Sequence, residues 1–387
     1  MTDPQFKFFV SCSPGIEPIL SGECQGLGLT WSQETQPDMS SSAGEEPGGI
    51  LLWGSLLDVY RCNLHLRTAS RVSVRLGSFH AVSFAELRKK AARLEWSRFI
   101  HPGQALNISV TCHKSRLYHS DAVAERVLGA VNDSFASQKT GSKPCILGKH
   151  GVLVLVRLVN DLCTISIDSS GELLHKRGYR QETAKAPLRE TLAAAMLLAS
   201  GWNGSIPLID PFCGSGTIPI EAALLSSHIP PGINREFAFM RWPGFERDQW
   251  QNLLSIARKE IIPPTTLISG YDRDAGAITI ASSNAARAGQ KDVILFIQQP
   301  ISALTASETP GWIITNPPYG LRVTSGRDLR DLYARFGEIL RVNFTGWQAG
   351  ILVSDPRLGG NLGLPVPQLT FRFINGGIPV KYQLFQL

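Results

Sequence analysis

The sequence predicts an α/β fold in which a doubly wound, mainly parallel sheet follows a smaller α+β part. Three observations support this prediction. After about residue 170, short apolar strands alternate with helix-length segments, which is the pattern of a parallel sheet covered by helices. Before that point strands and helices are mixed, and one strand pair is joined by Asn160-Asp161. The chain ends in two strand-like runs around Gly376-Gly377, which predicts an antiparallel hairpin.

The individual elements follow from apolar spacing and from the turn residues that bound each segment. In the first part, we predict strands at 6–11, 71–79, 105–112, 152–158 and 162–168, and helices at 15–26, 55–66, after Ser83 and at 120–135. Residues 35–49 and 137–150 are polar with Gly and Pro and are predicted as loops. In the second part, we predict strands at 207–210, 266–271, 293–297, 312–315 and 349–353, helices at 184–200, 217–227, 274–288 and 329–343, and a hairpin at 369–374 and 380–385.

Positive charge is concentrated in the first part of the chain. The 387 residues carry a formal net charge of +6, and the stretch from Arg61 to Arg126 contains twelve Lys or Arg but only four acidic residues. A basic region beside a near-neutral remainder is typical of a protein that binds a polyanion. A solvated helix face gives a similar composition. Charge alone therefore favours nucleic acid as a partner without establishing it.

Composition excludes several other classes of protein. No apolar run reaches the roughly 18–20 residues that cross a bilayer, and the longest candidate, Thr191–Ser200, is too short. The first residues lack the basic and apolar regions of a secretory signal, so we expect a cytoplasmic protein without a membrane partner. Seven widely spaced cysteines show no zinc-type pairing, which predicts reduced thiols and no metal site. The sequence carries no signal for the oligomeric state.

A glycine-containing loop follows the strand predicted at 207–210. It supplies six candidate cofactor-binding residues: Asp210, Cys213, Gly214, Ser215, Gly216 and Thr217. The two glycines let the backbone turn sharply, and the free amides of the next helix face a ligand held there. Asp210 and Glu221 add negative charge, which suits the sulfonium and ammonium groups of S-adenosylmethionine (SAM) better than a pyrophosphate. No Gly-Lys-Ser/Thr is present, so a nucleoside triphosphate loop is not expected.

Acidic residues mark the end of the next strand, in the sequence Tyr271-Asp-Arg-Asp274. A carboxylate at this position can accept hydrogen bonds from both ribose hydroxyls of a nucleoside. We therefore choose Asp272 as a cofactor-binding residue. Asp274 directly precedes a predicted helix and is interpreted as its N-cap.

The segment Thr315-Asn-Pro-Pro-Tyr-Gly320 follows the strand at 312–315 and supplies the candidate catalytic residues Asn316, Pro317, Pro318 and Tyr319. The prolines stiffen the backbone. The side-chain oxygen of Asn316 and the carbonyl of Pro317 can accept the two hydrogens of an exocyclic amine, so that the nitrogen lone pair points at a methyl donor. The Tyr319 ring can stack on a base. All three motifs follow strands of the predicted sheet, at the edge where ligands bind in such folds.

Further segments form a wider pattern around these motifs. They are 175–180 (HKRGYR), 186–190, 231–232, 237–239, Trp242, 319–322, 346–347 and 375–376, with 63–71 and 115–119 in the first part. Together with the three motifs, they resemble the THUMP-domain guanine-N2 RNA methyltransferases, in particular the RlmL-type 23S rRNA enzymes and their YpsC-like relatives. The resemblance covers nearly the whole chain and is most specific between 175 and 350.

This resemblance implies a class I methyltransferase fold, SAM as cofactor, an N2-methylguanosine product and RNA as partner, with 23S rRNA favoured over tRNA. It also implies three domains: a ferredoxin-like part at 1–60, a THUMP RNA-binding domain at 61–170 and a methyltransferase domain at 171–387. Some relatives carry a second methyltransferase domain. A chain of this length is expected to perform a single methylation.

The resemblance also assigns individual residues. Ala186 and Leu188 match a stretch near the methionine end of SAM. Three candidate RNA-binding residues lie in the RNA-facing stretch of the THUMP domain: Lys114, Arg116 and His119. Relatives often have an acid near the cofactor adenine where this chain has Gln298-Gln299. Either glutamine can substitute for it, and Gln299 is our candidate.

We expect direct, in-line methyl transfer without a covalent intermediate, and we interpret Cys213 as a packing residue. Three rival hypotheses remain: a DNA adenine-N6 methyltransferase, a protein glutamine methyltransferase and a non-catalytic RNA-binding assembly factor. The basic first part argues against the first two, and intact Asn316 and loop glycines argue against the third. The segment 231–259 either lines the RNA path or covers the sheet.

Overall fold

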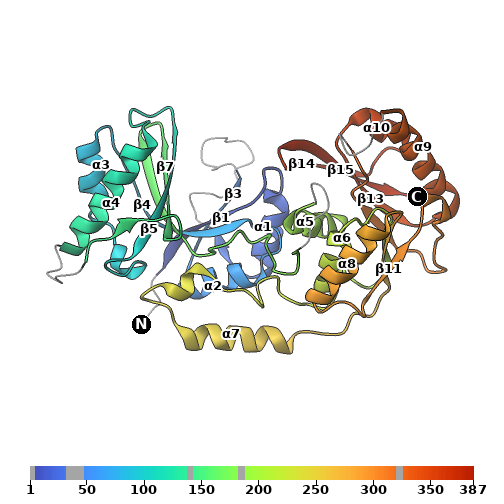
Figure 1. Ribbon diagram of the computed structural model, residues 1–387, viewed down its shortest axis with the longest axis horizontal. Helices are drawn as coiled ribbons and strands as arrows, with labels where there is room; N and C mark the ends of the chain where they lie inside the picture. Colours follow the sequence, from blue (N-terminus) through green and yellow to red (C-terminus); the bar gives the residue numbers. More distant parts are fainter. Residues whose placement is uncertain (1–4, 32–47, 137–142, 182–187, 320–325) are drawn as a thin grey trace.

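The computed structural model describes residues 5–31, 48–136, 143–181, 188–319 and 326–387. Two sheets lie side by side along the longest axis of the molecule (Figure 1), one built before residue 169 and the other after residue 207. Helix α7 (Arg247–Lys259) runs beneath their junction in this view. Within the described ranges, no helix combines the length and apolar character that a bilayer span requires.

The first sheet has eight strands in the order β2-β3-β1-β4-β8-β7-β5-β6. The strands are β1 (Phe6–Ser11), β2 (Thr30–Trp31), β3 (Gly49–Gly54), β4 (Arg71–His80), β5 (Ala105–His113), β6 (Ile146–Leu147), β7 (Val152–Val159) and β8 (Leu162–Asp168). The helices are α1 (Glu17–Gly26), α2 (Leu56–His65), α3 (Phe84–Ala91) and α4 (Ser120–Ala136). Strand β4 pairs with β1 on one side and β8 on the other, so one sheet runs through this whole part.

Local sequence explains where these helices begin. Ser55 and Asp58 form a reciprocal cap, in which the Asp58 amide donates to the Ser55 hydroxyl and the Ser55 amide donates to the Asp58 carboxylate. At α3 the Ser83 hydroxyl accepts a hydrogen bond from the Glu86 amide, which confirms the predicted helix start, while the Glu86 carboxylate accepts from the Val82 amide. Helix α2 runs across residue 60, where the first domain boundary stays a prediction.

The second sheet has seven strands in the order β11-β10-β9-β12-β13-β15-β14. The strands are β9 (Leu208–Asp210), β10 (Ile268–Asp272), β11 (Ile294–Gln298), β12 (Trp312–Thr315), β13 (Gln348–Val353), β14 (Leu369–Asn375) and β15 (Ile378–Gln386). The helices are α5 (Glu190–Ser200), α6 (Thr217–Ser226), α8 (Ala275–Arg287), α9 (Gly326–Asn343) and α10 (Pro356–Asn361). Strands β9 to β13 pair in parallel, whereas β15 is antiparallel to β13 and β14. The predicted parallel sheet with a terminal hairpin is confirmed.

Successive residues of a strand point to opposite faces of the sheet. Apolar side chains therefore emerge on both faces of the second sheet, and helices cover both. Leu208 belongs to a core that also contains buried residues of α5 and α6, whereas Ile209 belongs to a core with α9. Ile314 and Ile313 divide between the same two cores. The central strands β9 and β12 are therefore buried on both sides, as their near-continuous apolar residues predict.

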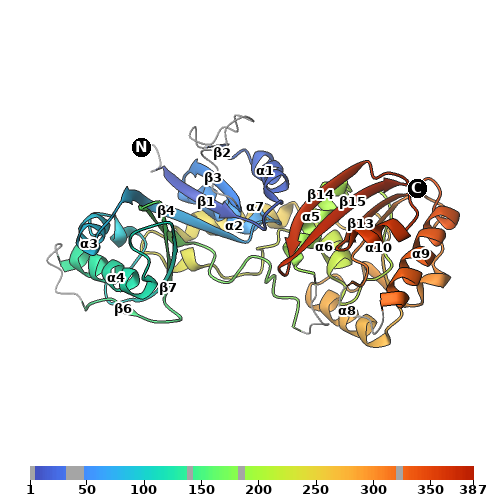
Figure 2. The same ribbon diagram turned by 90° about the horizontal axis from the view of Figure 1, so that it is seen from above.

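The terminal hairpin lies on the side of the second sheet that faces α1 (Figure 2). Contact between the two parts is close there. A Cβ atom placed on Gly15, which has a φ of +92°, would lie 2.0 Å from the carbonyl oxygen of Arg372 in β14. Only glycine combines this left-handed backbone with this approach at no steric cost.

The sequence prediction missed strands β2, β3 and β6 and helices α7 and α10, and β6 lies within the stretch 137–150 that was predicted as a loop. Strand β3 and helix α7 illustrate why. Strand β3 follows a stretch rich in Ser, Gly, Pro and acids, and its buried Ile50 and Leu52 show their role only through pairing with β1. Helix α7 buries Trp250, Leu254 and Ala257 against a largely polar remainder. Long-range packing rather than local pattern stabilises both elements.

Candidate active site

The three motifs meet where the order in which strands are added to the second sheet reverses. From β9 the chain proceeds to β10 and β11 on one side, and then returns to form β12 on the other side of β9. Such a switch point opens a crevice at the carboxyl ends of the two central strands. Asp210 ends β9 and Thr315 ends β12, and the Thr315 hydroxyl donates a 2.6 Å hydrogen bond to Asp210 Oδ1. This bond links the glycine loop directly to the residue before Asn316.

The environment of Asp210 is unusual for a carboxylate. The residue is 2% exposed, and burial raises its pKa to about 7. Hydrogen bonds from the Thr315 hydroxyl and the Phe212 amide lower the pKa, and the nearby Asp272 charge raises it. Burial outweighs the two donors because the charged form loses its hydration. Asp210 therefore lies inside the protein, where its carboxyl group binds the Phe212 amide of the glycine loop.

The glycine loop is tied to the end of β10. The Gly214 amide donates to Asp272 Oδ2 at 3.0 Å, and the Cys213 amide donates to the Tyr271 carbonyl at 2.9 Å. Gly214 and Gly216 have φ values of +53° and +81°, in the left-handed region that favours glycine. A Cβ atom at Gly214 would meet no atom within 4 Å, so the loop surface is open there. A ligand can approach the backbone at this point.

These strand ends fit a nucleoside-bearing cofactor. Asp272 is half-buried and binds the amides of Gly214 and Asp274, at 3.0 Å each. A carboxylate has about four acceptor sites, so two are left for hydroxyl donors. The backbone amide of Gln299 donates to the backbone carbonyl of Asp272 at 2.9 Å, which brings this half-buried glutamine beside the acid. Gln298 is exposed and bonds to the Arg273 carbonyl instead.

Cys213 and Ser215 occupy interior positions in the loop. Cys213 is 6% exposed, and burial holds the pKa of its thiol well above the ordinary value, which does not favour a thiolate nucleophile. Ser215 is 5% exposed, and its carbonyl accepts a 3.0 Å bond from the Asn284 side chain in α8. These contacts fix the shape of the loop.

An unpartnered polar atom lies in the Asn-Pro-Pro-Tyr segment. The Asn316 Oδ1 atom is buried and has no hydrogen-bond partner in the described part of the chain. Leaving such an acceptor unsatisfied costs about 1–3 kcal/mol. An N–H donor from a bound amine would satisfy it. Pro317 next to it is buried, and Pro318 is half-buried with its carbonyl 3.4 Å from the Tyr333 hydroxyl.

Tyr319 is more enclosed than the sequence suggests. The side chain is 4% exposed, and its hydroxyl accepts a 2.7 Å hydrogen bond from the Asn375 amide of β14. Little ring surface is open to a base in this arrangement. Stacking therefore requires some of the covering atoms to move, and it stays a prediction.

Arg180 connects the segment before α5 to the glycine loop, and the sequence reasoning did not select it as a site residue. One of its terminal nitrogens donates to the Thr217 hydroxyl at 2.7 Å and to the Leu188 carbonyl at 2.8 Å. The guanidinium also lies 3.1 Å from Glu190. Leu188, which is buried, is thereby held next to the start of α6. The HKRGYR segment was the available signal. Ala186 lies outside the described residues.

Glu221 corrects one expectation about the charge of the loop. Its side chain is fully buried 3.5 Å from Arg177, and the Tyr179 hydroxyl donates to it at 3.1 Å. Arg177 compensates its charge inside the protein. Glu221 therefore holds the 175–180 segment in place and does not offer free negative charge to a cofactor.

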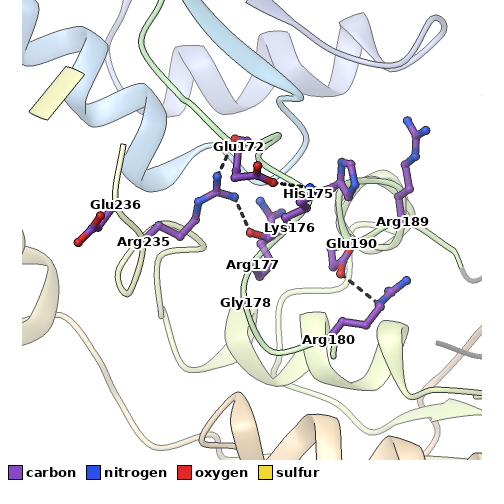
Figure 3. Close-up of a pocket in the computed structure, with 10 residues that line it drawn as sticks. All are labelled: Glu172, His175, Lys176, Arg177, Gly178, Arg180, Arg189, Glu190, Arg235 and Glu236. Atoms are coloured by element: carbon purple, nitrogen blue, oxygen red, sulfur yellow. Dashed lines mark hydrogen bonds and ion pairs between the residues drawn. The ribbon is translucent and has the colours of Figure 1, made fainter. Parts of the chain in front are cut away.

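A pocket of about 650 Å³ opens beside this segment (Figure 3). Its lining is rich in charge: Glu172, His175, Lys176, Arg177, Arg180, Arg189, Glu190, Arg235 and Glu236, with Gly178. Much of that charge is already engaged. Lys176 pairs with Glu172, and Arg235 donates to four backbone carbonyls between 172 and 176. No residue of the three motifs is among those that line this pocket.

The segment 231–259 packs against the first part. Phe239 stacks on Tyr60 of α2 with ring centroids 4.3 Å apart, and Trp250 of α7 meets both rings edge to face. Trp242 packs edge to face on Phe99. These contacts place the segment against the first part, which differs from the predicted cover over the second sheet. The predicted role in the RNA path stays a prediction.

The three candidate RNA contacts share one surface loop between β5 and α4. Lys114, Arg116 and His119 are all exposed, and Lys114 adopts a left-handed φ of +48°. The Arg116 amide bonds to Asp161 at 2.7 Å, which anchors the loop on the turn between β7 and β8. Tyr118, which is 67% exposed, lies against the His119 ring. The loop presents cationic and aromatic groups to solvent together, although sequence reasoning did not single out Tyr118.

The sheet order, the terminal hairpin and the switch-point motifs define the second part as a Rossmann-like class I methyltransferase domain. Family models match most of the chain. Residues 177–362 match the RMKL-like methyltransferase domain, 7–73 the RlmL ferredoxin-like domain and 81–168 the THUMP domain. The chain belongs to this family of THUMP-containing, RMKL-like methyltransferases.

Relatives and a solved structure support this assignment. The chain is 34% identical to "Ribosomal RNA large subunit methyltransferase K/L" of Syntrophotalea carbinolica, over 100% of this chain and 54% of the relative. It is 31% identical to "Putative RNA methyltransferase slr0064" of Synechocystis sp., over 98% of this chain and 97% of the relative. The crystal structure of "SMU.472, a putative methyltransferase complexed with SAH" is 28% identical, with a TM-score of 0.89 over 100% and 99% of the two chains. The chain thus spans about half the length of the K/L relatives.

Proposed function

We propose that this protein transfers a methyl group from SAM to the exocyclic N2 amino group of a guanosine in RNA. The observation that carries the proposal is the buried, unpartnered Asn316 Oδ1 atom in a segment that the Thr315–Asp210 hydrogen bond ties to the glycine loop. In the proposal, the Asn316 oxygen that accepts a hydrogen bond from the amine lies next to the glycine loop that binds the nucleoside of the cofactor. The relatives named as rRNA and RNA methyltransferases make RNA the first substrate to test.

The residues at the switch point fit SAM, which supplies an electrophilic methyl group when bound. In the proposal, Asp272 accepts the ribose hydroxyls, the backbone at Gly214 and Gly216 approaches the cofactor, and Gln299 lies near the adenine. Leu188, and Ala186 by resemblance, flank the methionine end. The solved relative whose name includes SAH supports SAM as the cofactor.

The catalytic proposal assigns orientation to the Asn316 segment. Asn316 Oδ1 and the Pro317 carbonyl accept the two amine hydrogens, which directs the nitrogen lone pair toward the methyl group. A new N–C bond forms as the S–C bond breaks, and the surplus amine proton leaves to water. No covalent bond to the protein forms at any stage. Pro318 restricts the backbone, and Tyr319 borders the base.

The proposal assigns RNA binding to the first part of the chain. Lys114, Arg116 and His119 contact the phosphates or bases around a target that is single-stranded or flipped out. Large-subunit rRNA is the proposed substrate, with tRNA as the second candidate, and the activity is placed in the cytoplasm. The proposed domains are 1–60, 61–170 and 171–387.

A transfer assay with purified protein tests this function. Labelled SAM is incubated with total RNA from cells that lack the gene, with DNA or with a release-factor protein, and the products are digested and separated. We expect label only in N2-methylguanosine from RNA. Label in N6-methyladenine of DNA or in methylglutamine would replace the proposal with the corresponding rival. RNA binding without transfer to any substrate would favour a non-catalytic assembly factor.

A further inference from the structure

The tip of the β14–β15 hairpin carries one inward-facing polar side chain. Ile374, Gly376, Gly377 and Ile378 are exposed, whereas Asn375 is 6% exposed. A polar residue at a tight hairpin turn is usually solvated. Here the two glycines make the turn with φ values of +57° and +84°, and the asparagine is turned toward the protein. Burial of an amide at this position calls for a partner.

That partner is a candidate catalytic residue. The Asn375 side-chain amide donates a 2.7 Å hydrogen bond to the Tyr319 hydroxyl, and both residues are buried. Tyr319 lies four residues beyond the end of β12. A longer contact, 3.4 Å between the Tyr333 hydroxyl and the Pro318 carbonyl, also reaches this short segment. The bond from Asn375 is therefore a strong second anchor for the segment.

The anchor is rigid because the hairpin extends the same sheet that carries the segment. Asn375 pairs with Ile378 at the end of the β14–β15 ladder, β15 pairs with β13 over six residues, and β13 pairs with β12. The Asn375–Tyr319 bond closes this path into a ring that begins and ends on β12. Backbone ladders on one side and a buried hydrogen bond on the other restrict the positions that the Asn316–Tyr319 segment can adopt.

We infer that Asn375 is a positioning residue for methyl transfer: by holding the Tyr319 hydroxyl, it sets the Asn316 side chain at the distance that the amine requires. This inference rests on the proposed function. Misplacement of reacting groups by a fraction of an ångström lowers the rate while cofactor binding persists. Loss of Asn375 is therefore expected to lower kcat and to leave SAM affinity unchanged.

A double-mutant cycle tests this inference in the full chain. The variants are Asn375→Ala, Tyr319→Phe and the pair together, assayed with labelled SAM and RNA from cells that lack the gene. We expect each single change to lower kcat about tenfold, as for loss of one buried hydrogen bond. The double variant should be no slower than the slower single variant, because both changes remove the same bond. SAM affinity, measured by calorimetry, should stay within twofold of wild type for Asn375→Ala.

Gln386→Ala is the matched control, because its side chain is also an amide of this hairpin and donates to the Trp347 carbonyl at 3.1 Å. It should keep the wild-type kcat. If Asn375→Ala behaves like Gln386→Ala, or if the two losses multiply in the double variant, the inference is overturned. If Asn375→Ala does not fold, Tyr319→Phe removes the same bond from the other side, and wild-type kcat in that variant contradicts the inference. A wild-type protein without transfer to RNA would instead overturn the proposed function.

Discussion

The Thr315 hydroxyl donates a 2.6 Å hydrogen bond to the buried carboxylate of Asp210. This bond joins the ends of β12 and β9, the two neighbouring strands at which the strand order of the second sheet reverses. Each residue ends its strand. Thr315 precedes Asn316, and Asp210 opens the glycine loop. The contact therefore couples the position of the proposed amine site to that of the proposed cofactor site.

Thr315→Val should weaken that coupling. The change keeps the side-chain shape but removes the hydroxyl donor from the buried Asp210. We expect a loss of about 1–3 kcal/mol in free energy of unfolding, together with a lower kcat. Urea unfolding and initial rates measure the two effects. Thr315→Ser retains the hydroxyl and should be close to wild type in both. If the valine and serine variants have equal rates, the hydrogen bond does not position the segment.

Asp210 should give the protein a distinctive pH dependence. Burial raises its folded pKa from 3.8 to about 7, so the native state holds the proton more tightly than the unfolded state. Its contribution to stability is complete below pH 3.8 and is lost as pH rises toward 7, by at most about 1.4 kcal/mol per pH unit. Asp210→Asn cannot titrate and should lack this decline.

The measurement for this prediction is the free energy of unfolding of both proteins between pH 4 and 8. Taking the difference between them cancels other buried acids whose pKa is also raised, such as Asp168 and Glu190. We expect the stability of the wild type relative to Asp210→Asn to fall up to pH 7 and then to level off. A difference that does not vary with pH would contradict the raised pKa.

Asp272→Ala should weaken SAM binding more than it weakens the fold. The substitution removes the proposed ribose acceptor and the bond to the Gly214 amide. Loss of a charged hydrogen-bond acceptor costs about 1.5–3 kcal/mol, which corresponds to a roughly 10- to 150-fold higher Kd. Asp274→Ala, two residues away, removes the cap on the Gly276 amide and serves as the control. Calorimetric titration with SAM should separate the two variants, and equal affinities would remove Asp272 from the cofactor site.

The loop between β5 and α4 should contribute to RNA affinity through charge. The double substitution Lys114→Ala with Arg116→Ala removes two exposed cations. We expect weaker RNA binding and a decrease of up to about 1.8 in the slope of log K against log salt, since each phosphate contact contributes about 0.7–0.9. Lys149→Ala with Arg157→Ala changes charge by the same amount elsewhere in the first part. If both pairs have the same effect, the loop has no special role.

The strand-end motifs and the parallel sheet could be predicted because their signals are local. A glycine loop after Asp210 and an Asn-Pro-Pro-Tyr segment after Thr315 can each be recognised within a few residues. The supporting contacts could not, because they join residues that are 105 apart for Thr315 and Asp210 and 56 apart for Asn375 and Tyr319. Pairing across such distances depends on sheet order, which periodicity does not specify.

Glu221 illustrates a different limit. Its position in the helix after the glycine loop made it a plausible source of negative charge for a cationic cofactor. Its burial beside Arg177 became visible only when the 175–180 segment was placed against α6. A charge can be read from the sequence, but the group that neutralises it cannot.

The most direct test of the central proposal is nucleoside mass spectrometry of RNA from cells with and without the gene. Large-subunit rRNA and tRNA are separated before digestion, and the deletion strain is complemented with wild type, Asn316→Ala or Asn343→Ala, a control amide that donates to the Leu304 carbonyl. We predict that N2-methylguanosine is lost from large-subunit rRNA and is restored by wild type and Asn343→Ala but not by Asn316→Ala. Loss from tRNA would change the substrate and keep the chemistry. An unchanged level of every methylated nucleoside would contradict the account.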